Sequence, residues 1–274
     1  MPGAEFNARP EAQAKINLLN FMRAEGRLED ATIMSELTVE NAANRADLVV
    51  SSSELVCFEI KTENDSLVRL DRQIARFSRC FERVYVACAS RHLKNVMRIV
   101  PDYIGLLELR TGQAHGSEVG RVREALPSPA RSVTGLLSLL PLSEIRSRFT
   151  ECRALKKRAQ IEFLAGQIEY SFARSVVNGF IENRYKDSSD KFLRAAEVDF
   201  FQADIRLLSA WSKEPTSQNA GINLQSRFDL EYAVYSHIGG SFGSVPDDIK
   251  HIFENAQSFH SSSNDGRGVV KFAC

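Results

Sequence analysis

The sequence lacks the motifs of several common enzyme classes. None of its 5 histidines stands in an HExxH or HxH spacing, and no GxxxxGK[ST] loop occurs. Zinc-protease and P-loop chemistry are therefore excluded as interpretations. The 5 cysteines are odd in number, scattered and never arranged as CxxC, which argues against a zinc knuckle or a disulfide framework.

Excess charge of either sign is also absent, because Lys+Arg and Asp+Glu both number 35. Attraction to nucleic acid must then come from local clustering. No apolar run approaches the roughly 20 residues of a membrane span, and the N-terminus has neither a basic nor an apolar signal region. We expect a cytoplasmic protein without a membrane partner, and 274 residues with 43% hydrophobic content predict a globular chain of one or two domains.

The N-terminal part predicts an α/β domain over residues 1–112. Helical spacing marks residues 10–24, 65–82 and a segment around 93–100 as helices. Strand patterns cover 32–39, 46–50, 55–61, 84–89 and 104–109, and the apolar run 84–89 is typical of a strand buried on both faces. The resulting order, α-β-β-β-α-β-α-β, predicts a mixed sheet with flanking helices.

The rest of the chain changes character. Glycine, serine and proline are frequent over residues 113–129, which we interpret as a linker. Residues 130–274 predict a mostly helical C-terminal domain with a flexible tail after 260. The helical pattern includes one long repeat from 161 to 180 and further segments at 192–211 and 230–238.

Three side chains on neighbouring strands predict metal-dependent phosphodiester chemistry. Asp47 and Glu59 are suited to bind Mg²⁺ or Mn²⁺ together with the carbonyl of Ile60, because such ions prefer oxygen ligands. Lys61 shares the strand face of Glu59 and could activate water or stabilise the transition state. Alternation along residues 55–61 places apolar side chains on one face and these charges on the other. The alternative is a solvated acid and a solvated ion pair.

Further residues support this constellation. Gln73, on the following helix, could reach the metal-bound water or the scissile phosphate, and Glu36, near the end of the first strand, could face Asp47. Glu11 in the first helix is a second supporting acid. Each of the three could equally be a solvated surface residue. Asp65 is interpreted as a structural residue, the N-cap or a first-turn acid of its helix.

Local clusters of basic residues predict contact with a phosphate backbone. The first follows the third strand, and the second begins the helical region. The residues expected to bind nucleic acid are Arg69, Arg72, Arg76, Lys156 and Lys157. A solvated helix face is the alternative for many of them, and nothing in the sequence indicates base-specific readout.

The residues around the constellation resemble the sce7726 group of PD-(D/E)XK-like proteins. The match covers about the first 110 residues: RADLVV at 45–50, FEIKTENDSL at 58–67, Arg69-Leu70, Gln73 and VPDYIG at 100–105. The resemblance implies a restriction-endonuclease-like fold and a divalent-metal nuclease, with Asp47, Glu59 and Lys61 at the active-site positions.

The sequence thus predicts a metal-dependent nuclease that acts on DNA and in which dimerisation would suit cleavage of both strands. RNA is the alternative substrate within the same fold. A different class of alternative is a non-catalytic module that binds nucleic acid or protein and has kept the fold.

Overall fold

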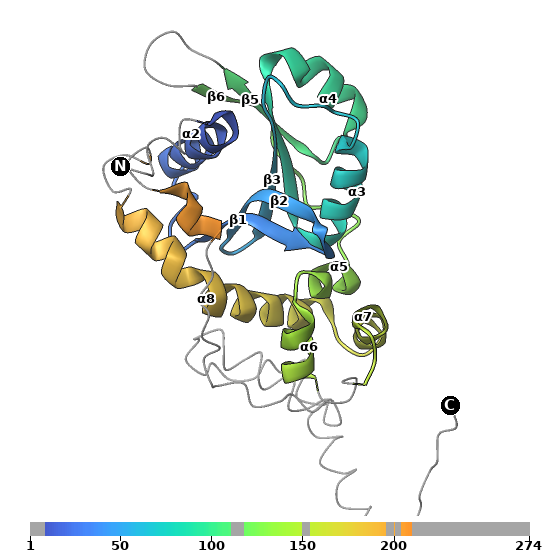
Figure 1. Cartoon of the computed structure of the whole chain (residues 1–274). Coiled ribbons are helices and arrows are strands. Elements are labelled where there is room, and N and C mark those ends of the chain that lie inside the picture. Colours follow the sequence, from blue (N-terminus) through green and yellow to red (C-terminus); the bar gives the residue numbers. More distant parts are fainter. Residues whose placement is uncertain (1–8, 111–117, 150–153, 196–199, 201–203, 210–274) are drawn as a thin grey trace, which may run out of the picture. The chain divides into compact units, whose positions relative to one another are not determined.

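A computed structural model of the chain describes residues 9–110, 118–149, 154–195, 200 and 204–209. They all lie in the first of two units into which the chain divides, Met1–Leu230 and Glu231–Cys274. This part is a mixed α/β structure with a six-stranded sheet (Figure 1). The helix expected at 230–238 and the expected tail lie outside the described residues.

The sheet follows the order of the chain, so that every strand lies beside its sequence neighbours. The first three strands are antiparallel, the third to fifth are parallel, and the sixth returns antiparallel to the fifth. The strands are β1 (Thr32–Val39), β2 (Asn41–Ser51), β3 (Leu55–Lys61), β4 (Arg83–Ala89), β5 (Gly105–Arg110) and β6 (Glu118–Arg123).

Seven α-helices and two 3₁₀ turns are described. They are α2 (Pro10–Ala24), α3 (Leu70–Cys80), η1 (Ser90–His92), α4 (Leu93–Ile99), α5 (Val133–Ser138), α6 (Leu142–Arg148), α7 (Lys157–Ala165), α8 (Tyr170–Ala195) and η3 (Ile205–Ser209). Among the described residues, none of these helices combines the length and the apolar character needed to cross a membrane.

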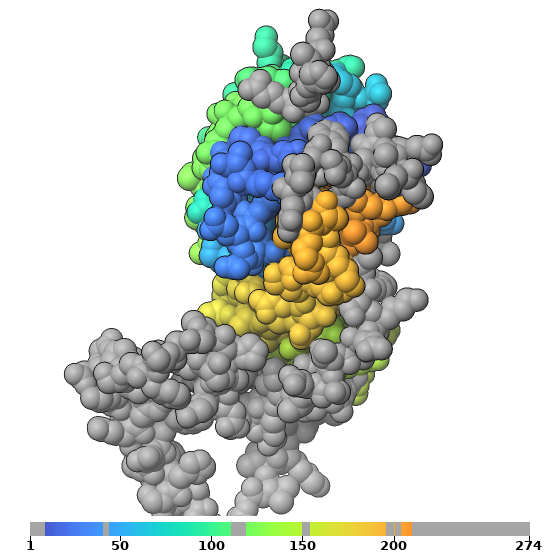
Figure 2. Space-filling model, turned by 90° about the vertical axis from the view of Figure 1, so that its left-hand side faces the viewer, coloured from blue at the N-terminus to red at the C-terminus, as the bar shows by residue number. Residues whose placement is uncertain are grey.

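One face of the sheet packs against α2, α8 and η3 in a single apolar core. Figure 2 looks onto this side, where α2 is blue and α8 is yellow to gold. Phe58 and Tyr85 stack at 5.1 Å on the sheet, and Phe192 and Phe200 stack at 5.5 Å beside them. Helix α8 also protects the edge of the sheet, because the N–H of Ile33 on β1 donates to the Ser189 hydroxyl at 2.9 Å.

The other face of the sheet is covered by α3 and α4, both of which contact β4 (Figure 1). Every residue from Val84 to Ala89 is buried, which confirms the prediction of a strand enclosed on both sides. The predicted α2, β1 and β3 also have the observed bounds.

Several predicted boundaries differ from the structure. Residues 118–123 form β6 inside the segment interpreted as a linker. The helix predicted from 65 begins at Leu70, because Asp65 accepts hydrogen bonds from the N–H and hydroxyl of Thr62 and closes a separate turn. The long repeat from 161 is divided between α7 and α8, with Gly166 capping the first.

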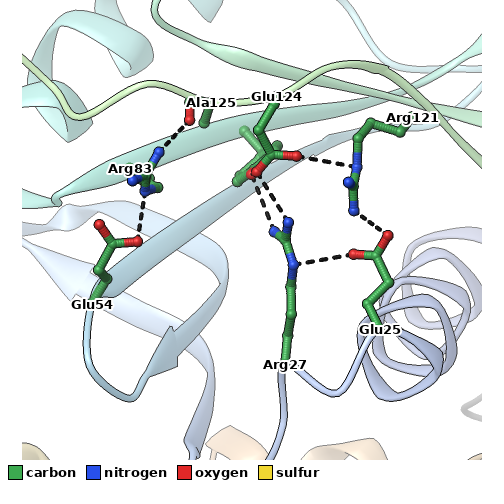
Figure 3. Close-up of polar contacts among 8 residues, drawn as sticks. Glu25, Arg27, Glu54, Arg83, Arg121, Glu124 and Ala125 are labelled. Atoms are coloured by element: carbon green, nitrogen blue, oxygen red, sulfur yellow. Dashed lines mark hydrogen bonds and ion pairs between the residues drawn. The ribbon is translucent and has the colours of Figure 1, made fainter.

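A network of ion pairs lies where β3 and β4 begin, at the opposite end of β3 from Lys61 (Figure 3). Arg27 contacts Glu25 and Glu124 at 3.1 Å each, and Arg121 pairs with the same two carboxylates. These contacts join the end of α2 to β6. In a separate pair, Arg83 donates to Glu54 at 2.6 Å. Arg83 therefore has an internal partner, although it belongs to a basic segment of the sequence.

Candidate functional site

The predicted acid and lysine of β3 meet a glutamine of α3. Lys61 Nζ lies 2.6 Å from Glu59 Oε1 and 3.2 Å from Gln73 Oε1. Both charged side chains are buried, with Glu59 1% and Lys61 9% exposed. The structure therefore brings these three predicted residues together, but under α3 instead of on the solvated face that alternation alone suggested.

Glu59 is only partly satisfied by its neighbours. Its Oε2 atom is buried and has no hydrogen-bond partner in the described part of the chain. Burial raises the pKa of Glu59, while the charge and hydrogen bond of Lys61 oppose the rise without cancelling it. The ammonium of Lys61 is thus the main counter-charge of this carboxylate.

Asp47 of β2 lies beside this pair and holds the backbone of β3. The ladder between the two strands ends at Leu48 and Phe58, and one step further Asp47 Oδ2 accepts the N–H of Ile60 at 2.7 Å. Burial, followed by the charge of Glu59, raises the pKa of Asp47 well above its ordinary value. The side chain thus replaces a ladder hydrogen bond where the two strands separate.

The supporting acids Glu11 and Glu36 gather around a lysine. Carboxylate oxygens of Glu11, Glu36 and Asp47 all lie within 4.8 Å of one another. Lys15 Nζ, from α2, lies 2.7 Å from Glu11 and 2.5 Å from Glu36, and it donates to the Ser35 hydroxyl at 3.0 Å. Burial disfavours the charge on Lys15, but the bonds to both glutamates outweigh it and raise the pKa of Lys15.

The backbone of Glu36 is strained. Its φ of 59° is in the left-handed region although the residue lies within β1, a conformation that costs a non-glycine residue about 1–2 kcal/mol. The left-handed backbone thus interrupts β1 at the residue whose side chain meets Lys15. Contact with that ammonium helps to offset the strain.

These residues do not fit a divalent cation as they are placed. The ammonium of Lys15 already pairs with two of the three clustered acids, and one oxygen of Asp47 accepts the Ile60 N–H. Glu59 is outside that cluster of three and pairs with Lys61. The Mg²⁺ site expected from Asp47, Glu59 and the Ile60 carbonyl remains a prediction. In the described residues Lys15 pairs with Glu11 and Glu36, Lys61 pairs with Glu59, and Asp47 accepts the Ile60 N–H.

The predicted nucleic-acid residues divide into two sets. Arg69, Arg72 and Lys156 are exposed. Arg76 donates to Glu40 at 2.8 Å and also to Asn44. Lys157 is half-buried, donates to the Ser138 carbonyl at 3.2 Å, and has a pKa lowered by burial. Only the first set is directly available to a partner.

Sequence reasoning missed two internal counter-charges. Lys15 pairs with the supporting acids, and Glu40 pairs with arginines of α3. A signal for Lys15 was present, because Glu11 and Lys15 stand four residues apart on a predicted helix and such pairs meet. No comparable local signal marks Glu40. Its position opposite α3 depends on the β1–β2 hairpin, which local spacing does not specify.

Comparison with known proteins gives a consistent family. A family model described as bacteriophage P4 protein cII matches residues 4–209. Protein cII of Enterobacteria phage P4 is 33% identical over 192 residues, which cover 67% of this chain and 70% of that protein. No solved structure matches the chain.

These matches overturn the identification with the sce7726 group and, with it, the prediction of a metal-dependent nuclease and the enzyme class. The acid-x-lysine pattern is short, so it arises easily without catalysis. In this chain Glu59 and Lys61 form a buried internal ion pair, which accounts physically for the presence of both residues.

Proposed function

Because the chain belongs to the bacteriophage P4 cII protein family, we propose that it is a non-catalytic binding module whose partner is nucleic acid. The observation that supports a non-catalytic role is the internal pairing of the acids. Lys61 binds Glu59 at 2.6 Å, and Lys15 binds Glu36 at 2.5 Å. Each of these carboxylates has an ammonium group as its counter-charge, and the arrangement supports a structural role for them.

We propose further that β1 to β4, with α2 and α3, form a restriction-endonuclease-like core. Three antiparallel strands followed by a parallel fourth, with a helix between β3 and β4, support this assignment. Asp47 and Glu59 stand on adjacent strands as the acids of such cores do. The same framework can bind a partner without cutting it, since a fold does not dictate a function.

The partner follows from exposed basic side chains on the face covered by α3 and α4. Arg69 and Arg72 are exposed at the start of α3, and Lys94 and Arg98 are exposed on α4. Within the described part of the chain, none of these four has a carboxylate at ion-pair distance. Side chains of this kind supply the sequence-independent affinity for a phosphate backbone.

Fluorescence anisotropy with labelled duplex DNA, single-stranded DNA and RNA tests the proposal. The full-length protein should bind at least one polymer, and a variant with Arg69, Arg72, Lys94 and Arg98 all changed to Ala should bind it roughly tenfold or more weakly. The matched control changes Lys186 and Lys191 of α8 to Ala, which should alter affinity less than about twofold.

The same labelled polymers should remain intact during incubation with Mn²⁺. Absence of binding to all three polymers, or equal binding by the fourfold variant, would contradict the nucleic-acid proposal. Comparison of the three polymers identifies which of DNA and RNA is preferred, and sedimentation in the presence and absence of the bound polymer shows whether a dimer forms.

A further inference from the structure

Glu40 joins two strands and at the same time contacts two arginines. It is the single residue between Val39, which ends β1, and Asn41, which begins β2. Its Oε2 lies 2.8 Å from Arg76 Nε and its Oε1 lies 3.7 Å from Arg79 Nη2. Both oxygens of one carboxylate therefore face guanidinium groups of α3.

A third cation, on another helix, interacts with Glu40 through its charge. Lys157 is the first residue of α7, and its pKa is lowered by burial while the charge of Glu40 acts in the opposite direction. Glu40 is thus in contact with two guanidinium groups, and the charge of a third cation also acts on it. The local excess of positive charge favours the binding of a further anion.

The conformation of Glu40 indicates that its side chain, and not its backbone preference, explains its presence. Its φ is 59°, in the left-handed region, where glycine or asparagine would be more favourable than glutamate by roughly 1 kcal/mol. The ion pairs with Arg76 and Arg79 offset this cost. The negative charge of Glu40, which pairs with these arginines, therefore accounts for a glutamate at this turn.

The arginines of α3 form one continuous row. Arg69, Arg72, Arg76 and Arg79 follow one another at spacings of three and four residues, so they lie along one side of the helix over about 15 Å. The first two are exposed, and the last two face Glu40. Glu40 therefore pairs with the C-terminal end of this row, and the N-terminal end of the row is exposed to solvent.

We propose that Arg76 and Arg79 form a phosphate-binding site that Glu40 fills in the free protein and that a backbone phosphate of bound nucleic acid takes over. The inference rests on the proposed function and deepens it. A guanidinium binds phosphate and carboxylate with the same fork of N–H donors. The site is reachable, because the side chains of Arg79 and Glu40 are 53% and 26% exposed.

The test uses the full chain with Glu40→Gln, which removes the charge and keeps the size. This variant should bind the oligonucleotide roughly five- to tenfold more tightly than the wild type. Inorganic phosphate should also raise its melting temperature more than that of the wild type. Adding Arg76→Ala should abolish both gains.

Glu54→Gln is the matched control, because Glu54 also lies in a turn between strands and pairs with an arginine, Arg83, at the other end of the sheet. It should show neither gain. Glu40→Asn provides a second variant, since asparagine tolerates the left-handed conformation. Folding of these variants only in phosphate would support the site, and failure to fold with or without phosphate would overturn it in favour of a structural Glu40.

The outcomes separate this inference from the function on which it rests. Unchanged oligonucleotide affinity in Glu40→Gln, with normal wild-type binding, would overturn the inference alone. A phosphate-dependent rise in melting temperature without any gain in oligonucleotide affinity would indicate a free-phosphate site and overturn the nucleic-acid part. Failure of both wild type and variant to bind any polymer would overturn both proposals.

Discussion

Lys15 Nζ lies 2.5 Å from Glu36 Oε1, although α2 and β1 place these residues 21 positions apart in the chain. The same ammonium also binds Glu11, one helical turn earlier. A lysine that is 4% exposed thus forms the centre of an acidic cluster. Two acids expected to support a metal site instead have an internal cation.

Replacing Lys15 by Met should destabilise the protein by about 1–2 kcal/mol, because two partly exposed carboxylates lose their buried counter-charge. Urea unfolding at neutral pH measures the effect. Lys191→Met is the control, since Lys191 pairs with Asp187 in an exposed position, and it should cost less than about 0.5 kcal/mol. Equal effects of the two substitutions would contradict the assigned role of Lys15.

Divalent cations should distinguish the same variant from the wild type. Mn²⁺ should leave the melting temperature of the wild type unchanged, because the ammonium of Lys15 already lies between Glu11 and Glu36. It should raise that of Lys15→Met, whose carboxylates are free to bind an ion. Thermal melting with and without EDTA provides the measurement. Tight Mn²⁺ binding by the wild-type protein would instead favour the magnesium site predicted from the sequence.

Asp47→Asn should become more stable relative to the wild type as the pH rises. Burial and the charge of Glu59 raise the pKa of Asp47 above 3.8, so the folded wild type binds more protons than the unfolded chain between that value and the raised pKa. Wild-type stability therefore falls with increasing pH across this window. Asparagine keeps an oxygen to accept the Ile60 N–H but cannot ionise.

Urea unfolding of both proteins from about pH 4 to about pH 8 tests this linkage. The stability difference should grow in favour of asparagine above about pH 4 and then level off. Asp187→Asn, at an exposed position of α8, should show little pH dependence. A difference that changes in favour of aspartate with rising pH would mean that the pKa of Asp47 is lowered in the folded protein.

Two glycines should respond oppositely to alanine. A Cβ on Gly135, in α5, would lie 1.9 Å from the carbonyl oxygen of Arg79 in α3, so Gly135→Ala should cost at least about 2 kcal/mol. Gly179, in α8, has no atom within 4 Å of the added Cβ, and Gly179→Ala should gain about 0.5–1 kcal/mol. Thermal or urea unfolding measures the change in stability of each variant. A stabilising Gly135→Ala would contradict the close approach of α3 and α5.

Salt dependence should report the arginines that contact a nucleic acid. For duplex DNA, each lost phosphate contact lowers the slope of log K against log salt by about 0.9. Changing Arg69 and Arg72 to Ala should therefore reduce the slope by about 1.8. Anisotropy titrations over a range of salt concentrations measure it, and an unchanged slope would remove both residues from the interface.

Local pattern was sufficient for much of the sheet. Alternation fixed the bounds of β3, and the continuous apolar run of β4 predicted its burial on both faces. It was insufficient for β6, whose residues Glu118–Arg123 are mostly charged or glycine and become a strand by pairing with β5. The local pattern also predicted one continuous helix across Gly166, because apolar residues keep helical spacing on both sides of the break between α7 and α8.

The sequence by itself determined which residues can form strands and helices and that Glu59 and Lys61 share a face, since these properties depend on neighbours along the chain. Tertiary structure alone decided what those charges contact. Helix α3 buries Glu59 with Lys61, and α2 brings Lys15 to Glu36. The β1–β2 hairpin likewise sets Glu40 against Arg76. Buried charges take their partners from distant elements, so an acid–lysine spacing identifies the charges without fixing their role.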